Sequence, residues 1–259
     1  MAWPNNSMLA IGSSDGTVRL WDAASGSCTA TLQGDRGGAL YAVACSRNGM
    51  LATGSTDGAA KLWDVGGGAC ATTLQLPGHT SSVISAAFVN SNQLITGGQD
   101  ETARIWNLDT GSCIDVLLGH SGTVRSVCAN PQGTQLAIGS NDEAIKLWLS
   151  SGTCTGTLLG HSSLVHSVSF NLCGSKLASG SFDNTAKVWD LASGTCIATL
   201  EGHSGWVTSV VWLNNGAQLA TGCGTWPVAP PPCRQTAESS ALSSATTAWS
   251  YSQAIQTEP

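Results

Sequence analysis

A fourteen-residue segment recurs five times along the chain at an almost constant spacing. The copies are LAIGSSDGTVRLWD, LATGSTDGAAKLWD, LITGGQDETARIWN, LAIGSNDEAIKLWL and LASGSFDNTAKVWD, which begin at residues 9, 51, 94, 136 and 177. Their tryptophans, Trp21, Trp63, Trp106, Trp148 and Trp189, are 42, 43, 42 and 41 residues apart. A period of about 40–45 residues is typical of one supersecondary unit that stacks on copies of itself. The spacing therefore predicts a repeat architecture.

Each repeat has the pattern of four short strands. In the third repeat the expected strands are 83–89, 93–98, 102–108 and 113–118, separated by Asn, Asp, Gly and Ser residues that favour turns. No segment of convincing length has a helical period. The sequence therefore predicts an all-β fold of antiparallel meanders.

These repeats resemble the WD40 family, which has Gly-His near the start of a repeat and Trp-Asp near its end. The pairs Gly78-His79 and Trp63-Asp64 are examples, and the resemblance covers residues 1 to about 223. It implies a β-propeller of four-stranded antiparallel blades. The five registered repeats predict five complete blades, and Gly202-His203 followed by LATGCG predicts half of a sixth. We expect an incomplete or unclosed ring.

The chain divides into two expected regions. Residues 1–223 form the WD40 propeller repeats, and residues 224–259 form a tail rich in Pro, Ser, Thr and Ala that is expected to be mostly irregular. Thr225 stands where the repeat calls for Asp, so the pattern breaks inside a unit. A changed exon or reading frame and a genuine binding tail both remain open.

The family resemblance implies a buried hydrogen-bond chain of Asp, His, a hydroxyl residue and Trp in each blade. The third and fifth blades match all four members, with His79, Thr96, Asp100 and Trp106, and with His161, Ser179, Asp183 and Trp189. The second keeps Thr53, Asp57 and Trp63 but has Asp35 in place of His. The fourth keeps His120, Asp142 and Trp148 but has Ile138 in place of the hydroxyl.

A His–Ser–Asp set also invites interpretation as a catalytic triad. A nucleophilic triad occurs once in an enzyme, whereas this set recurs at the repeat period beside a tryptophan. Recurrence favours a structural network, and no separate pair of acids or metal cluster is visible. We therefore expect no enzymatic activity, no cofactor and no metal.

Composition narrows the possible partners and the compartment. The net charge of −6 argues against nucleic acid or an anionic membrane as the main partner, and no apolar run reaches the roughly 18 residues of a membrane span. Five repeat cysteines are expected to be small buried residues at the start of strand four, too far apart for disulfides; they are Cys28, Cys70, Cys113, Cys154 and Cys196. Free thiols favour an intracellular location, cytoplasmic or nuclear.

The expected function is that of a protein–protein interaction scaffold. The family resemblance implies docking on the face that carries the loops entering strand one and the turns between strands two and three. The candidate contact residues there are Tyr41, Arg125, His166, Phe182 and Trp206, because aromatic and Arg side chains are enriched in hot spots. Alternatively, Phe182 and Trp206 only cover apolar surface, and His166 is a tolerated surface residue.

Two alternatives to this scaffold remain. One is a truncated product without independent function, and another, less favoured, is a propeller enzyme. Open blade edges would also favour self-association.

Overall fold

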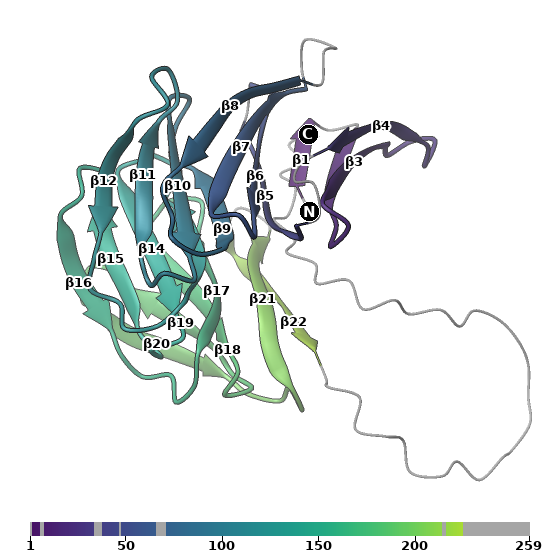
Figure 1. The fold of residues 1–259 in the computed structure, drawn as a ribbon. Helices are drawn as coiled ribbons and strands as arrows, with labels where there is room; N and C mark the ends of the chain where they lie inside the picture. Colours follow the sequence, from purple (N-terminus) through teal and green to yellow (C-terminus); the bar gives the residue numbers. More distant parts are fainter. Residues whose placement is uncertain are drawn as a thin grey trace, which may run out of the picture.

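The computed structural model describes residues 2–5, 8–33, 38–46, 48–65, 71–213 and 216–224, and all of its regular elements are strands (Figure 1). The predicted tail lies outside the described residues except for Gly224, which is the last residue of β22 rather than the first of the tail.

The described strands form five four-stranded sheets and one two-stranded sheet, as the repeats predict. The first sheet contains β1 (Ala2–Asn5), β2 (Met8–Gly12), β3 (Thr17–Asp22) and β4 (Cys28–Gln33). The second contains β5 (Leu40–Cys45), β6 (Met50–Ser55), β7 (Ala59–Asp64) and β8 (Ala71–Pro77). The third contains β9 (Val83–Phe88), β10 (Gln93–Gly98), β11 (Ala103–Asn107) and β12 (Cys113–Leu117).

The remaining sheets follow the same order. The fourth contains β13 (Val124–Ala129), β14 (Gln135–Ser140), β15 (Ile145–Leu149) and β16 (Cys154–Leu158). The fifth contains β17 (Val165–Phe170), β18 (Lys176–Ser181), β19 (Ala186–Asp190) and β20 (Thr195–Leu200). The sixth contains only β21 (Trp206–Leu213) and β22 (Gln218–Gly224).

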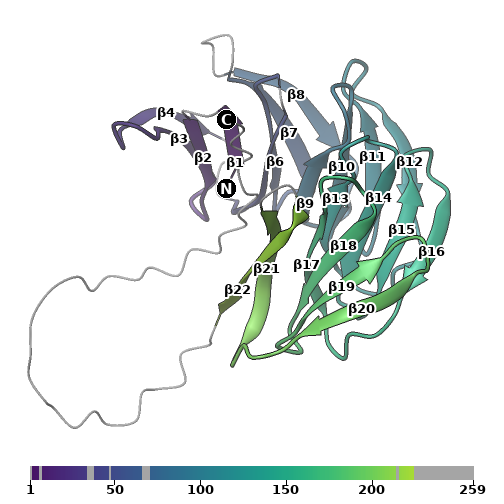
Figure 2. The same ribbon diagram turned by 180° about the vertical axis from the view of Figure 1, so that it is seen from behind.

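Successive sheets pack face to face and form an arc (Figures 1 and 2). Each neighbouring pair shares a separate apolar cluster: Leu20 with Leu51 for the first two sheets, for example, and Ala178 with Val207 for the last two. No such cluster joins the sixth sheet to the first among the described residues. The ring is therefore not closed.

A glycine in strand two allows the sheets to approach closely. A Cβ atom on Gly97 would lie 2.4 Å from Val124 of the next sheet, and one on Gly180 would lie 2.7 Å from Val207. A side chain cannot be accommodated at these distances without a shift of the next sheet. The packing of the sheets therefore requires glycine at this position of strand two.

Hydrogen bonds that were not predicted from the sequence also join neighbouring sheets. Ser85, Ser126 and Ser167 each accept a hydrogen bond from a backbone N–H of the next sheet's first strand, at 3.1–3.2 Å. The signal that could have found them is a serine two residues after the first valine of strand one, repeated at the period of the fold. These bonds set the spacing between the first strands of adjacent sheets.

Candidate functional site

The complete hydrogen-bond chains form in the third and fifth sheets. In the third, His79 Nδ1 lies 2.9 Å from Asp100, His79 Nε2 lies 2.8 Å from Thr96 Oγ1, and Trp106 Nε1 donates to the same hydroxyl at 2.8 Å. Strand pairing produces this geometry because Leu94 and Thr96 of β10 face Trp106 and Arg104 of β11.

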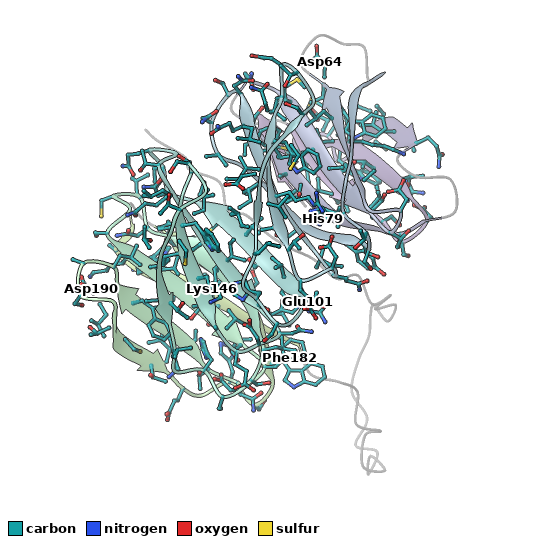
Figure 3. All side chains as sticks on the ribbon, turned by 60° about the vertical axis from the view of Figure 1, so that its left-hand side comes forward. Asp64, His79, Glu101, Lys146, Phe182 and Asp190 are labelled. Carbon is teal, nitrogen blue, oxygen red and sulfur yellow. The ribbon has the colours of Figure 1, made fainter. Side chains whose placement is uncertain are left out.

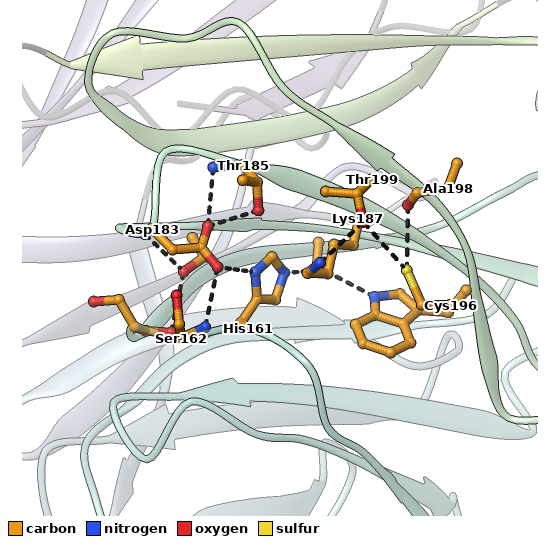
Figure 4. A network of polar contacts seen from close by, with 12 residues as sticks. His161, Ser162, Asp183, Thr185, Lys187, Cys196, Ala198 and Thr199 are labelled. Atoms are coloured by element: carbon orange, nitrogen blue, oxygen red, sulfur yellow. Dashed lines mark hydrogen bonds and ion pairs between the residues drawn. The ribbon is translucent and has the colours of Figure 1, made fainter.

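The fifth sheet repeats the arrangement with serine as the hydroxyl (Figure 4). His161 Nδ1 lies 2.7 Å from Asp183, His161 Nε2 lies 2.7 Å from Ser179 Oγ, and Trp189 Nε1 donates to Ser179 at 2.8 Å. One continuous set of bonds therefore joins the loop before strand one, strand two, the turn that follows it and strand three.

The pKa shifts define where the protons lie in these chains. Burial lowers the pKa of His79 and His161 against the opposing effect of their aspartates, so both imidazoles are neutral at pH 7. Burial alone would raise the pKa of Asp183, but hydrogen bonds from Thr185 and His161 lower it to about 2. The ionised Asp183 therefore accepts the Nδ1–H, and Nε2 accepts the Ser179 hydroxyl proton.

In the third and fifth sheets this arrangement gives both ring nitrogens of the histidine, the hydroxyl and the indole N–H a hydrogen-bond partner. Thr96 and Ser179 have no exposed surface, and each hydroxyl accepts an indole N–H. A substrate cannot reach either oxygen. This geometry favours the interpretation of the His–hydroxyl–Asp sets as structural networks, in which shared satisfaction of buried groups rigidifies the sheet.

The fourth sheet has a broken chain. His120 Nδ1 lies 2.7 Å from Asp142, but the buried His120 Nε2 and Trp148 Nε1 have no hydrogen-bond partner. Ile138, 1% exposed, occupies the register position of Thr96 and Ser179. The structure thus keeps the two ends of the network and leaves both unsatisfied where the hydroxyl is replaced.

The second and first sheets keep only fragments of the chain. Trp63 Nε1 donates to Thr53 at 3.0 Å, and the carboxylate of Asp57 accepts the Ala59 N–H. Asp35 lies outside the described residues. In the first sheet, Asp15 bonds Thr17 and pairs with the exposed Arg19.

The sixth sheet contains a further fragment that the sequence analysis did not single out. His203 Nε2 lies 2.6 Å from Thr221 Oγ1, as in the complete chains. The Gly202-His203 pair and the Thr of LATGCG were the available signal.

Three of the five candidate partner residues come together as one ring stack. Phe182 and Trp206 are parallel within 4°, with ring centroids 4.2 Å apart, and His166 stacks on Phe182 at 5.3 Å. Phe182 projects from the turn after β18 at the molecular surface (Figure 3), whereas Trp206 opens β21 of the next sheet. The stack therefore spans the fifth and sixth sheets.

His166 lies at the buried end of this stack. It is 4% exposed, so the interpretation of His166 as a surface residue is wrong. Its Nδ1 lies 2.9 Å from the Thr208 carbonyl of the adjacent sheet. Burial and, more weakly, the positive charge of Arg125 together lower the pKa of His166 to about 4, against the opposing effect of the Thr208 carbonyl.

Arg125 and Tyr41 occupy the same position of their strands as His166. Arg125 donates from Nε to Asn141 at 2.8 Å, and Tyr41 is 47% exposed on β5 of the second sheet, outside the ring stack. In β5, β13 and β17 the pairing with the second strand of the sheet shifts register at this residue, for example between Leu40 and Ala42. The position is a β-bulge, which re-aims a side chain relative to the alternation of the strand.

The expectation of buried repeat cysteines is wrong for four of the five. Cys28, Cys113, Cys154 and Cys196 are exposed free thiols, and Cys70 lies outside the described residues. Strand four is the outer edge of each sheet, so the residue that faces the repeat tryptophan across the strand pair reaches solvent.

The described residues hold no group of His, Cys, Asp and Glu that could bind a metal ion. Within the same residues, no helix is long and apolar enough to cross a membrane.

The sheets repeat one pattern and pack on each other through the glycines of their second strands. Two of them contain complete Asp–His–hydroxyl–Trp chains. Together they form an incomplete β-propeller. The family model described as WD domain, G-beta repeat matches the chain six times, at residues 1–22, 26–64, 68–107, 111–148, 152–190 and 194–225. The chain belongs to the WD40-repeat family. A comparison with curated proteins found no match.

Proposed function

We propose that this protein is a non-catalytic scaffold that binds partner proteins through an aromatic surface, defined here as Phe182 and Trp206 with Arg125, and supported from below by the buried His166. WD40 repeats generally mediate protein–protein interaction. We propose in addition that the face of the protein that carries Phe182 and Trp206 makes this interaction.

The observation that carries the proposal is the parallel stack of Phe182 on Trp206. Two large rings are held 4.2 Å apart across two sheets, with the His166–Thr208 bond fixing the base of the stack. Rings that are rigid before binding lose little conformational entropy in a complex. Trp and Arg are enriched among the few residues that carry most of the binding energy of an interface.

Other observations support the partner class and the compartment. The net charge of −6 disfavours a polyanionic partner such as nucleic acid or an anionic membrane. The exposed free thiols of Cys28, Cys113, Cys154 and Cys196 fit a reducing, intracellular environment, cytoplasmic or nuclear.

Tyr41 belongs to the proposal as a second contact on the same face.

The test is affinity capture with a double variant, Phe182→Ala with Trp206→Ala. Proteins retained by the wild-type chain from a cell extract are quantified by mass spectrometry, and we expect the variant to lose the specific ones. Ile197→Ala is the matched control, because Ile197 is a half-exposed apolar residue on the outer strand β20. Circular dichroism verifies that both variants fold.

The control decides between the alternatives. If the double variant retains the same proteins, or if Ile197→Ala loses them equally, the aromatic surface is not the docking site. If the wild-type chain retains no specific protein, the result favours a product without independent function.

A further inference from the structure

Among the described second strands, β22 is the one whose outer edge is not paired with a third strand. In the complete sheets strand two pairs with a strand on each side, whereas β22 pairs only with β21 among the described residues (Figures 1 and 2). Five consecutive residues of β18 are buried, from Leu177 to Ser181, but the matching residues of β22 are half-buried or exposed.

A specific side-chain pair lies at this edge. Thr221 Oγ1 lies 2.6 Å from His203 Nε2, which repeats the His–hydroxyl contact of the third and fifth sheets. In both of those sheets the same hydroxyl also accepts an indole N–H from strand three, at 2.8 Å. No described residue makes that second bond to Thr221. The sixth sheet therefore presents a hydroxyl acceptor positioned for a tryptophan.

The register of the complete sheets defines what a third strand would carry. In the fifth sheet Leu177 faces Trp189, Ser179 faces Lys187, and Gly180 faces Ala186. The equivalent residues of β22 are Leu219, Thr221 and Gly222. A strand that pairs with β22 in this register places Trp opposite Leu219, a basic residue opposite Thr221 and a small residue opposite Gly222.

We propose that β22 binds an extended segment of a separate protein, which adds to the sheet as an antiparallel strand with the pattern small–basic–branched apolar–Trp. Backbone hydrogen bonds to the strand edge supply affinity, and the indole bond to Thr221 supplies selectivity. This edge is distinct from the aromatic surface, so the two proposals are tested by different variants.

The described third strands do not offer this segment. They are each paired on both sides within their own sheets, so a second copy would have to unpair a strand to donate it. In residues 225–259, Trp226 and Trp249 are preceded two positions earlier by Gly224 and Thr247, and neither of these is basic. The pattern thus points to another polypeptide.

The probe is a capped, fluorescein-labelled peptide, NTAKVWDL, copied from residues 184–191 of the fifth sheet. Fluorescence anisotropy measures its binding to the full chain, and a peptide with Phe in place of Trp is the control. We expect the Phe peptide to bind about five-fold more weakly, since one net hydrogen bond is lost. In Thr221→Val the two peptides should bind equally, whereas Thr221→Ser should restore the preference.

Hydrogen exchange locates the peptide. The backbone amides of β22 that do not bond β21 should exchange rapidly in the free chain and slow down when the Trp peptide binds. No peptide binding, or equal binding of the two peptides to the wild-type chain, would overturn the proposal. Slow exchange of these β22 amides in the free monomer would assign the edge to the chain's own residues. A dimer that the peptide dissociates would assign it to a second copy. Either result rejects a separate partner.

Discussion

Replacing Ile138 with threonine should stabilise the protein by joining the two ends of the broken network in the fourth sheet. Ile138 faces Lys146 across the strand pair, in the register by which Thr96 faces Arg104 in the third sheet. A threonine hydroxyl at this position can donate to His120 Nε2 and accept from Trp148 Nε1, both of which are buried and unpartnered.

The magnitude follows from opposing terms. The substitution removes buried apolar volume equivalent to one or two methylene groups, at about 0.8 kcal/mol each. Each buried polar atom that gains a partner recovers about 1–3 kcal/mol. Threonine keeps the branched Cβ that suits a strand, so the backbone cost is small. We expect a net gain of roughly 1–2 kcal/mol, which corresponds to a rise in the melting temperature of roughly 2–8 °C.

Thermal melts of three variants test this reasoning. Ile145→Thr is the matched control, because Ile145 is fully buried in the same sheet but does not occupy the position of the network hydroxyl. This variant should lower the melting temperature. Adding Trp148→Phe to Ile138→Thr should remove part of the gain, since the indole donor is gone. A clear loss of stability in Ile138→Thr alone would mean that the site is packed as an apolar one and that the network does not extend to this sheet.

Two further predictions concern the polar groups. Asp100→Ala should destabilise the protein by about 1–3 kcal/mol, because it leaves His79 Nδ1 and the Thr80 N–H without the aspartate as partner. Asp15→Ala should cost less, because the first sheet has no histidine at the network position. Equal losses of the two variants in chemical denaturation would count against the network. Stability should fall as pH drops from 6.5 towards 4, because His166 has its ordinary pKa of 6.5 in the unfolded chain and a pKa of about 4 in the folded one. This contribution to stability is fully present above pH 6.5. His166→Gln should flatten the decline between pH 7.5 and 5, and an unchanged slope would refute the assignment to His166.

The aromatic surface was only partly predictable from sequence. The candidate positions followed from the repeat alignment, and Phe182, Trp206 and His166 do meet. Their stacking depends on a bulge in β17 and on the angle between two sheets. The alternation of a strand does not encode either of these.

The broken network is a similar case. The sequence shows Ile138 where a hydroxyl is expected, but it does not show whether the neighbouring residues adjust. Only the packed sheet reveals that His120 Nε2 and Trp148 Nε1 remain buried without partners.

The sequence by itself determined the repeating sheet, its strand order and the residues of the complete networks. Alternation, turns and the spacing of Asp, His and Trp act within one repeat, where chain connectivity sets which residues meet. The tertiary structure alone decided the burial of His166 and the serine bonds between sheets. Each of these depends on the surface that one sheet presents to the next, and so on contacts between residues a whole repeat apart.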